Sequence, residues 1–301
     1  MNHDKPCPLV SVVIPTLNSG SRIQNCLAAL FHQDYGEVEV IVVDGGSTDM
    51  TVRLASAARD GMKAATVVTM PGMGRASARR HGAALAKGMF ILFLDSDQTA
   101  DADLVSHCVQ LAIEHDLDFI TIPERDAGSG LWLHALLLDR KLGAIAGLRY
   151  PRFFRRRFYL ALGGHTEGLE DFMEDRELAI KARTASSKGA ESGTLHITNL
   201  VGRVNPLALG IKGSRAAQDA FDYYSLPRGI PESIWSVTIP RVRAALSQPS
   251  RLEPRMRVWL MLPLFMLISR GPRLLRAAKA SFFARLHRKR VNSPNQSRSH
   301  R

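Results

Sequence analysis

Short apolar runs rich in valine and isoleucine alternate with segments of helical period over the first 122 residues. This alternation is typical of an α/β fold, in which helices flank a mostly parallel central sheet. We expect strands at residues 10–14, 38–43, 65–69, 89–94 and 118–122. We expect helices at residues 21–33, 49–58, 74–87 and 103–115. The strand at 89–94 has no polar side chain, which predicts a central position in the sheet.

The pattern becomes less regular after Pro123. We still expect a helix within residues 128–147 and an amphipathic helix at 174–188. Earlier in the chain, Ser21 and Gln24 have the spacing of a capping box for the helix at 21–33. We divide the chain into a domain at 1–240, with halves at about 9–123 and 124–240, a basic helical extension at 241–291, and a tail at 292–301 that is predicted to be disordered.

The positive charge of the chain belongs to its C-terminal part. The net charge is +12, yet residues 1–240 hold 25 basic and 27 acidic side chains, whereas residues 241–301 hold 15 and 1. This part also contains the uncharged stretch 258–269, which includes Pro263 and is shorter than the ~20 residues of a membrane-spanning helix. We therefore expect a basic amphipathic extension that contacts an anionic membrane surface, and no nucleic acid. The alternative is a helix that packs on the domain.

A second basic group lies in the aromatic segment 150–159. It contains Arg152, Arg155, Arg156 and Arg157. These side chains could meet a phosphorylated lipid acceptor, or they could belong to a solvated surface strand.

The cysteines and the N-terminus predict a cytoplasmic protein. Cys7, Cys26 and Cys108 have no spacing typical of a disulfide framework or a thiolate metal site. The chain is polar up to Leu9, without the charged region and apolar run of a secretory signal. We expect a cytoplasmic location, with peripheral contact at the cytoplasmic face of the membrane.

Acidic side chains follow two of the predicted strands. Asp44 follows the strand at 38–43, and Asp95, Ser96 and Asp97 follow the strand at 89–94. In open α/β sheets, ligands bind beyond the carboxyl ends of the strands. Two carboxylates spaced i, i+2 can offer oxygens to one hard cation, which can bridge a diphosphate. Turn and cap formation is the alternative for each residue alone, but their occurrence together favours a binding site.

Four segments resemble, in order and spacing, the nucleotide-binding half of family 2 glycosyltransferases with the GT-A fold. They are VSVVIPTLN, VVDGGSTD, GMGRASARRHGAALAKG and FLDSD. The resemblance covers roughly residues 9–215. It implies that Pro15 and Thr16 line the pocket for the nucleotide base, that Asp44 contacts the base or the ribose, and that Arg79 faces the nucleotide.

The same resemblance implies a divalent cation, Mn²⁺ or Mg²⁺. Asp95, Ser96 and Asp97 would form the DxD motif of a nucleotide-sugar site, with Asp97 as the direct metal ligand. His196 is a weaker candidate for contact with the metal or the diphosphate. The alternative for His196 is a packed core residue.

A candidate general base lies in the second half of the chain. The segments Gly163–Glu167 and Glu174–Leu178 are similar to the GG-x-x-E and ED-x-x-L patterns of the family. The similarity implies that Asp175 takes a proton from an acceptor hydroxyl. The alternative is that the Asp175 carboxylate only stabilises the N-terminal end of a helix.

The expected activity is sugar transfer with inversion from a nucleotide-diphosphate donor to an acceptor hydroxyl. The QxxRW signature of processive synthases is absent from the sequence, which favours one sugar per encounter. The acceptor would be a lipid-linked or cell-envelope precursor. A nucleotidyltransferase is one rival, although PTLNSGSRI stands where its Gly-rich loop should be. A non-catalytic membrane-binding protein on a degenerate transferase fold is the other.

Overall fold

The computed structural model describes residues 7–58, 64–130, 132–134, 136–138, 149–169 and 173–205. Its centre is a seven-stranded sheet of order β3-β2-β1-β4-β8-β6-β9. These strands are β1 (Val10–Thr16), β2 (Val38–Asp44), β3 (Ala65–Thr69), β4 (Phe90–Phe93), β6 (Phe119–Thr121), β8 (Pro151–Arg155) and β9 (Gly189–Glu191). Neighbouring strands are parallel except at β8, which is antiparallel to both β4 and β6. The predicted mostly parallel sheet is confirmed.

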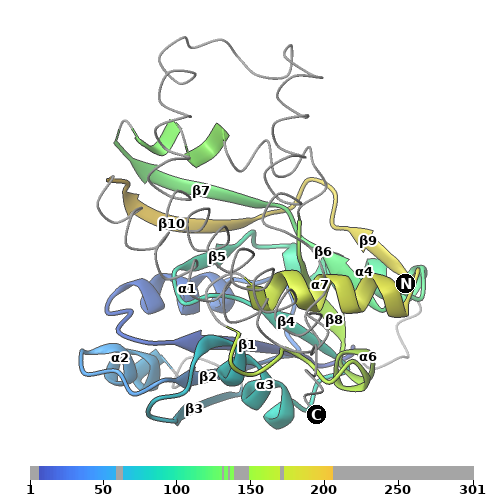
Figure 1. Cartoon of the computed structure of the whole chain (residues 1–301), viewed down its shortest axis with the longest axis horizontal. Coiled ribbons are helices and arrows are strands. Elements are labelled where there is room, and N and C mark those ends of the chain that lie inside the picture. The colour runs from blue at the N-terminus through green and yellow to red at the C-terminus, as the bar shows by residue number, and fades with distance from the viewer. Residues whose placement is uncertain are drawn as a thin grey trace, which may run out of the picture.

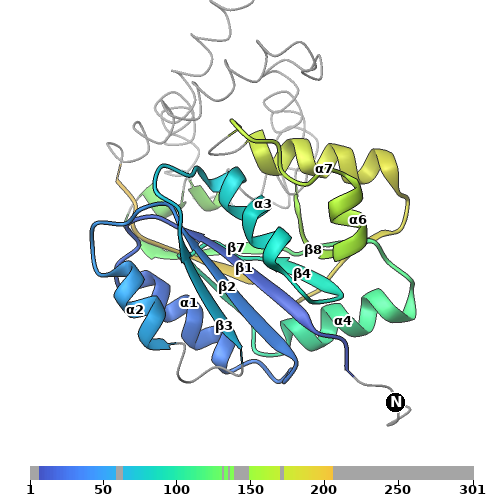
Figure 2. The same cartoon turned by 90° about the horizontal axis from the view of Figure 1, so that it is seen from below.

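Helices cover both faces of this sheet (Figure 2). One face carries α1 (Arg22–Phe31), α2 (Thr51–Ala58) and α4 (Leu104–Glu114), and the other carries α3 (Arg75–Leu85), α6 (Arg156–Ala161) and α7 (Met173–Ala185). Alternate residues of β1 enter the two cores, since Val12 packs with α1 and Val13 packs with α3. Burial on both faces explains why the inner strands read as continuous apolar runs.

A second sheet of three strands lies beside the large sheet (Figure 1). Its order is β5 (Gln98–Ala100), β10 (Ile197–Arg203) and β7 (Glu124–Ser129). β10 is antiparallel to β5 and parallel to β7. Because β5 comes directly after the loop that ends β4, this sheet borders the carboxyl ends of the central strands.

The strand and helix predictions for the first 122 residues are confirmed within a few residues at each end. Pro15 is accommodated within β1 because the pairing of β1 with β4 ends at Val13, so no ladder bond is missing there. The central position of β4 between β1 and β8 is also confirmed. The strand β7 was not predicted, and most of the predicted helix at 128–147 lies outside the described residues.

The predicted capping box at the start of α1 is wrong. Ser21 forms no side-chain cap, because it already has helical angles (φ −67°, ψ −14°). The backbone N–H groups of Ser19 and Gly20 instead donate to the Thr51 hydroxyl at 2.8 and 2.9 Å, which fixes the entry to α1 from outside the helix.

The basic aromatic segment is not a solvated surface strand. β8 is an inner strand, and Arg152, Phe153 and Phe154 are buried. The phenylalanines alternate between the two cores, Phe153 toward α1 and α4 and Phe154 toward α6 and α7. The burial of these phenylalanines on both faces of the sheet offsets the cost of placing arginines in an inner strand.

Within the described residues, no helix has both the length and the apolar character to cross a membrane. The uncharged stretch 258–269, the extension at 241–291 and the tail at 292–301 lie outside the described residues. The helix predicted at 174–188 is observed as α7 and ends at Ala185, where the chain turns into β9.

Candidate active site

The loops after β1, β2 and β4 meet at one edge of the large sheet and are joined by hydroxyl groups. The Thr16 hydroxyl donates to Ser19 Oγ at 2.9 Å, and Ser19 Oγ lies 2.5 Å from Ser96 Oγ. Asn18 Oδ1 accepts the backbone N–H of Thr48 at 2.9 Å. These contacts build a polar edge from three separate loops. They place Thr16 and Ser96 close together, as the sequence predicts.

Asp44 is fully buried and binds its own turn. Its Oδ2 accepts the backbone N–H groups of Gly46 and Ser47 at 3.0 Å each, and its Oδ1 accepts the Ser47 hydroxyl. Gly46 has φ +98°, a conformation that favours glycine. The structure therefore places Asp44 as the support of the Gly45–Thr48 turn. The contact of Asp44 with a base or ribose stays a prediction. Such a contact would use carboxylate oxygens that already accept the hydrogen bonds of the turn.

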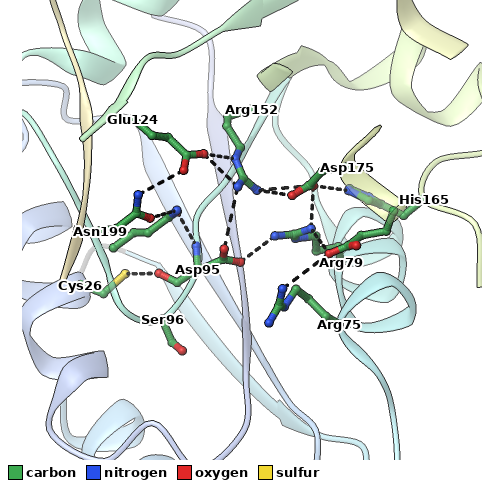
Figure 3. Close-up of polar contacts among 12 residues, drawn as sticks. Cys26, Arg75, Arg79, Asp95, Ser96, Glu124, Arg152, His165, Asp175 and Asn199 are labelled. Carbon is green, nitrogen blue, oxygen red and sulfur yellow. Dashed lines mark hydrogen bonds and ion pairs between the residues drawn. The ribbon is translucent and has the colours of Figure 1, made fainter. Parts of the chain in front are cut away.

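Arg79 joins the candidate DxD motif to the candidate base (Figure 3). Its Nη2 lies 2.6 Å from Asp95 Oδ1, and its Nη1 lies 2.8 Å from Asp175 Oδ1 and 3.3 Å from Glu174 Oε1. The side chain is fully buried. Burial of one guanidinium is tolerated because three carboxylates face it. Its Nε has no hydrogen-bond partner among the described residues.

The position of Arg79 follows from the small residues of α3. Ala76, Ala78, Gly82 and Ala83 are buried on this helix. A Cβ on Gly82 would lie 2.4 Å from Val13 Cγ1 and 3.2 Å from Val43 Cγ2. Glycine at position 82 therefore lets α3 lie close to β1 and β2, which directs Arg79 across the ends of the strands.

The carboxylates around Arg79 are held ionised. Burial raises the pKa of Asp95, but the guanidinium groups of Arg79 and Arg152 outweigh it and keep this pKa far below its usual range. Burial likewise raises the pKa of Asp175, and Arg152 and Arg79 together lower it well below the usual value. Both groups are therefore anionic near neutral pH.

The sequence offered Arg152 as a contact for a phosphorylated lipid acceptor or as a solvated side chain, and its place among carboxylates was not predicted. Its Nε and Nη2 lie 3.0 and 2.9 Å from Glu124 Oε1, its Nη1 lies 3.3 Å from Asp175 Oδ2, and its Nη2 lies 3.9 Å from Asp95 Oδ2. The only sequence signal was an arginine next to Phe153 and Phe154, in a segment short enough to form an inner strand.

His165 lies behind Asp175 and is neutral. Its Nε2 is 3.6 Å from Asp175 Oδ1, and its Nδ1 is 2.8 Å from the Tyr159 hydroxyl. Burial lowers the pKa of His165 to about 4, although Asp175 acts in the opposite direction. With the Tyr159 hydroxyl donating to Nδ1, the imidazole carries its hydrogen on Nε2, toward the carboxylate.

The His196 side chain faces Asp101, with Nδ1 at 3.8 Å from Asp101 Oδ2, and its contact with a metal or diphosphate stays a prediction. His196 lies opposite Asp101, with its backbone N–H donating to Asp101 Oδ2 at 2.8 Å. Leu200 is the residue opposite Asp97, since its N–H donates to the Asp97 carbonyl at 2.8 Å. His196 is four residues from Leu200 along β10, which corresponds to about 13 Å of strand.

The comparisons with known proteins assign the family. The sequence profile of glycosyl transferase family 2 matches residues 11–177, more than half of the chain. The chain belongs to this family. The match includes Pro15, Asp44, Arg79 and the 95–97 motif, and it ends at Glu177, two residues after Asp175.

One similar relative is the PGL/p-HBAD biosynthesis glycosyltransferase of Mycobacterium bovis (strain BCG / Pasteur 1173P2). It is 30% identical over 161 residues, which are 52% of this chain and 62% of the relative. The uncharacterized glycosyltransferase YibD of Escherichia coli (strain K12) is 28% identical over 109 residues, 36% of this chain and 32% of that protein. The chain spans less than two thirds of the length of these relatives.

Solved structures share the fold. The mannosyltransferase PcManGT from Pyrobaculum calidifontis, in complex with GDP-Man and Mn²⁺, has a TM-score of 0.58 at 16% identity, covering 97% of this chain and 89% of that one. S. aureus TarS 1-349 in complex with UDP-GlcNAc has a TM-score of 0.52 at 19% identity, covering 93% and 92%. These likenesses confirm a glycosyltransferase fold of the GT-A type.

The donor set at this edge fits a divalent cation that is shared with a substrate. The part of the chain that the structure describes has no cluster of three His, Cys, Asp or Glu side chains able to hold a metal. Mg²⁺ and similar cations are often held by one or two carboxylates together with substrate phosphates and water. Asp97 is partly exposed in the loop after β4, and Asp95 in the same loop binds Arg79, so the loop would offer the Asp97 carboxylate to such a cation.

Proposed function

We propose that this chain is an inverting glycosyltransferase that moves one sugar per encounter from a nucleoside-diphosphate donor to an acceptor hydroxyl. The observation that carries this proposal is the double contact of Arg79, at 2.6 Å from Asp95 and 2.8 Å from Asp175. This contact lies between Asp95, in the motif that would face the donor phosphates, and Asp175, which would deprotonate the acceptor. Membership of glycosyl transferase family 2 supports the same reaction class and disfavours a nucleotidyltransferase.

The donor would lie across the ends of β1, β2 and β4. Pro15 and Thr16 would line the base pocket, and the turn that Asp44 supports would bound the base or ribose. A divalent cation held by Asp97 would supply positive charge to the diphosphate oxygens.

The transfer would be a single displacement. The acceptor oxygen bonds to the anomeric carbon while the bond from that carbon to the diphosphate oxygen breaks, with its electron pair staying on the diphosphate. The acceptor proton moves to Asp175, which is ionised and therefore able to receive it. One base and one departing group on opposite sides of the sugar give inversion.

For the acceptor, we propose a lipid-linked or cell-envelope precursor at the cytoplasmic face of the membrane. The support is the excess of basic over acidic residues in 241–301 and the similarity to a mycobacterial glycosyltransferase of PGL/p-HBAD biosynthesis. Flotation of the full chain with vesicles of phosphatidylglycerol and of phosphatidylcholine tests this. Binding to the anionic vesicles alone, weakened by salt, is expected, and equal recovery with both would contradict it.

The donor site is tested by thermal unfolding with UDP, GDP and CDP, each with and without Mn²⁺. A nucleotide that binds only the native state raises its stability. We expect one nucleotide to stabilise the protein, and to do so more strongly with the metal. Asp97→Ala should lose the metal-dependent part, whereas Glu114→Ala, an exposed carboxylate on α4, should keep it. No stabilisation by any nucleotide would refute the donor site and favour a non-catalytic protein on a transferase fold.

A further inference from the structure

Arg152 is a buried guanidinium that faces carboxylates from three separate segments. Glu124 begins β7, Asp95 follows β4, and Asp175 lies in the first turn of α7. The two contacts with Glu124, at 3.0 and 2.9 Å, are shorter than those with Asp175 at 3.3 Å and Asp95 at 3.9 Å. These distances indicate that Glu124 anchors the guanidinium, and that its remaining N–H groups face the site.

Glu124 is itself held by a chain of hydrogen bonds with a fixed direction. The Asp95 N–H donates to Gln98 Oε1 at 2.8 Å, Gln98 Nε2 donates to Asn199 Oδ1 at 2.7 Å, and Asn199 Nδ2 donates to Glu124 Oε2 at 3.2 Å. A backbone N–H can only donate and an ionised carboxylate can only accept, so both amide orientations are determined. Asn199, Glu124 and Arg152 thus form an arc from the candidate DxD loop to Asp175 (Figure 3).

We propose that Arg152 is a positioning residue for the general base. Anchored by Glu124, its guanidinium orients the Asp175 carboxylate and holds it in the ionised state beside Asp95. The catalytic meaning of this role rests on the proposed function, because it assigns the base to Asp175. Arg152 contacts no reacting atom and acts through Asp175 alone.

The anchoring by Glu124 matters when the acceptor proton arrives. Once Asp175 is neutral, a guanidinium bound to it alone would be left buried without an opposite charge, which is strongly unfavourable. Arg152 keeps Glu124 as a close partner and Asp95 within 3.9 Å. The network therefore accommodates both protonation states of the base without moving the arginine.

Among the described residues, charged and titratable groups face Asp175 from several elements, besides the Tyr159 hydroxyl of α6. They are Arg79 from α3, Arg152 from β8, His165 from the loop after α6, Asp95 from the loop after β4, and Glu174 on α7 itself. Burial acts to raise the pKa of Asp175, and Arg152 heads the groups that lower it. Removing Arg152 should therefore raise this pKa while Arg79 still limits the rise.

The experiment compares the full wild-type chain with Arg152→Met, Arg152→Lys and Arg125→Met. Arg125 is the matched control, since it is an exposed arginine on β7 next to Glu124, paired with Asp101. The Asp carboxyl carbons are labelled with ¹³C and their chemical shifts are followed against pH, with Asp175→Asn identifying the resonance. The same proteins are tested for stabilisation by the nucleotide found for the wild type, and for turnover with its sugar donor.

We expect Arg152→Met to raise the pKa of Asp175 toward its ordinary range, and to lower kcat about 100-fold with little change in nucleotide affinity. Arg152→Lys should keep the pKa low, because the charge remains, and restore kcat only in part, because Lys cannot make the forked contact. Arg125→Met should match the wild type in both measurements.

An unchanged Asp175 titration in Arg152→Met would overturn the proposal, and so would a fall in nucleotide affinity as large as the fall in kcat. If Arg152→Met does not fold, Arg152→Gln gives the decision, since it keeps a polar side chain and loss of the positive charge should shift the same resonance in the same direction. The titration needs no substrate. Failure of every nucleotide to bind the wild type would therefore refute the proposed function while the carboxylate data still decide the role of Arg152.

Discussion

Replacing His165 by glutamine should remove a pH-dependent loss of stability. The imidazole is 1% exposed, and burial lowers its pKa to about 4 in the folded protein, whereas an imidazole in an unfolded chain has a pKa of about 6.5. Between these values the unfolded chain binds a proton that the folded protein does not. The free energy of unfolding therefore falls as the pH falls through this window, and is unaffected by this group above it.

The size of the effect follows from the two pKa values. Integrating the proton linkage gives a loss of about 2 kcal/mol between pH 7 and pH 5, and about 3 kcal/mol by pH 4. Urea unfolding of the wild type and of His165→Gln at pH 7, 6 and 5 measures it, since most carboxylates remain ionised there. His115→Gln, an exposed histidine after α4, controls for the substitution itself.

The free energy of unfolding of the wild type, minus that of His165→Gln, should fall by about 2 kcal/mol on going from pH 7 to pH 5. Parallel pH profiles for the two proteins would refute the reasoning. They would mean that the folded protein protonates His165 as easily as the unfolded chain does.

Three further predictions concern single positions. Gly82→Ala should lower the free energy of unfolding by about 1–3 kcal/mol, because its Cβ would lie 2.4 Å from Val13 Cγ1. Gly36→Ala is the control, since a Cβ there would have no atom within 4 Å. Equal melting temperatures for the two variants would contradict this prediction. Asp44→Ala should cost about 1–3 kcal/mol, since two N–H groups of the partly exposed turn lose their buried carboxylate acceptor, and a denaturation midpoint like that of the wild type would argue against it. Asp175→Asn should keep nucleotide-induced stabilisation and reduce transfer about 10²–10⁴-fold, and transfer at the wild-type rate would place the base elsewhere.

The parallel half of the sheet was predictable because its signals are local. The runs at β1, β2 and β4 are apolar on both faces apart from Ser11 and Glu39, and each ends at or just before a polar residue, namely Thr16, Asp44 and Asp95. Strands buried on both faces leave this trace in the sequence. Membership of the family could be read in the same way, since its motifs are contiguous segments between residues 11 and 177.

The contacts of these residues were not predictable. A carboxylate at a strand end is compatible with a ligand contact, a turn and an ion pair alike. Asp44 supports its own turn, and Asp95 binds Arg79 and lies near Arg152. The capping box at Ser21 failed for a similar reason, since a hydroxyl 30 residues away, that of Thr51, satisfies the backbone before the helix.

The sequence by itself determined the alternation of strands and helices, the family, and the candidates Asp95, Asp97 and Asp175. The tertiary structure alone decided that β8 enters the sheet antiparallel beside β4, and that Arg152 is a buried member of the site. The physical reason is that burial of a guanidinium is favourable only where carboxylates from distant segments meet it. Arg152 meets Glu124 and Asp95, 28 and 57 positions earlier, and no local pattern encodes such a meeting.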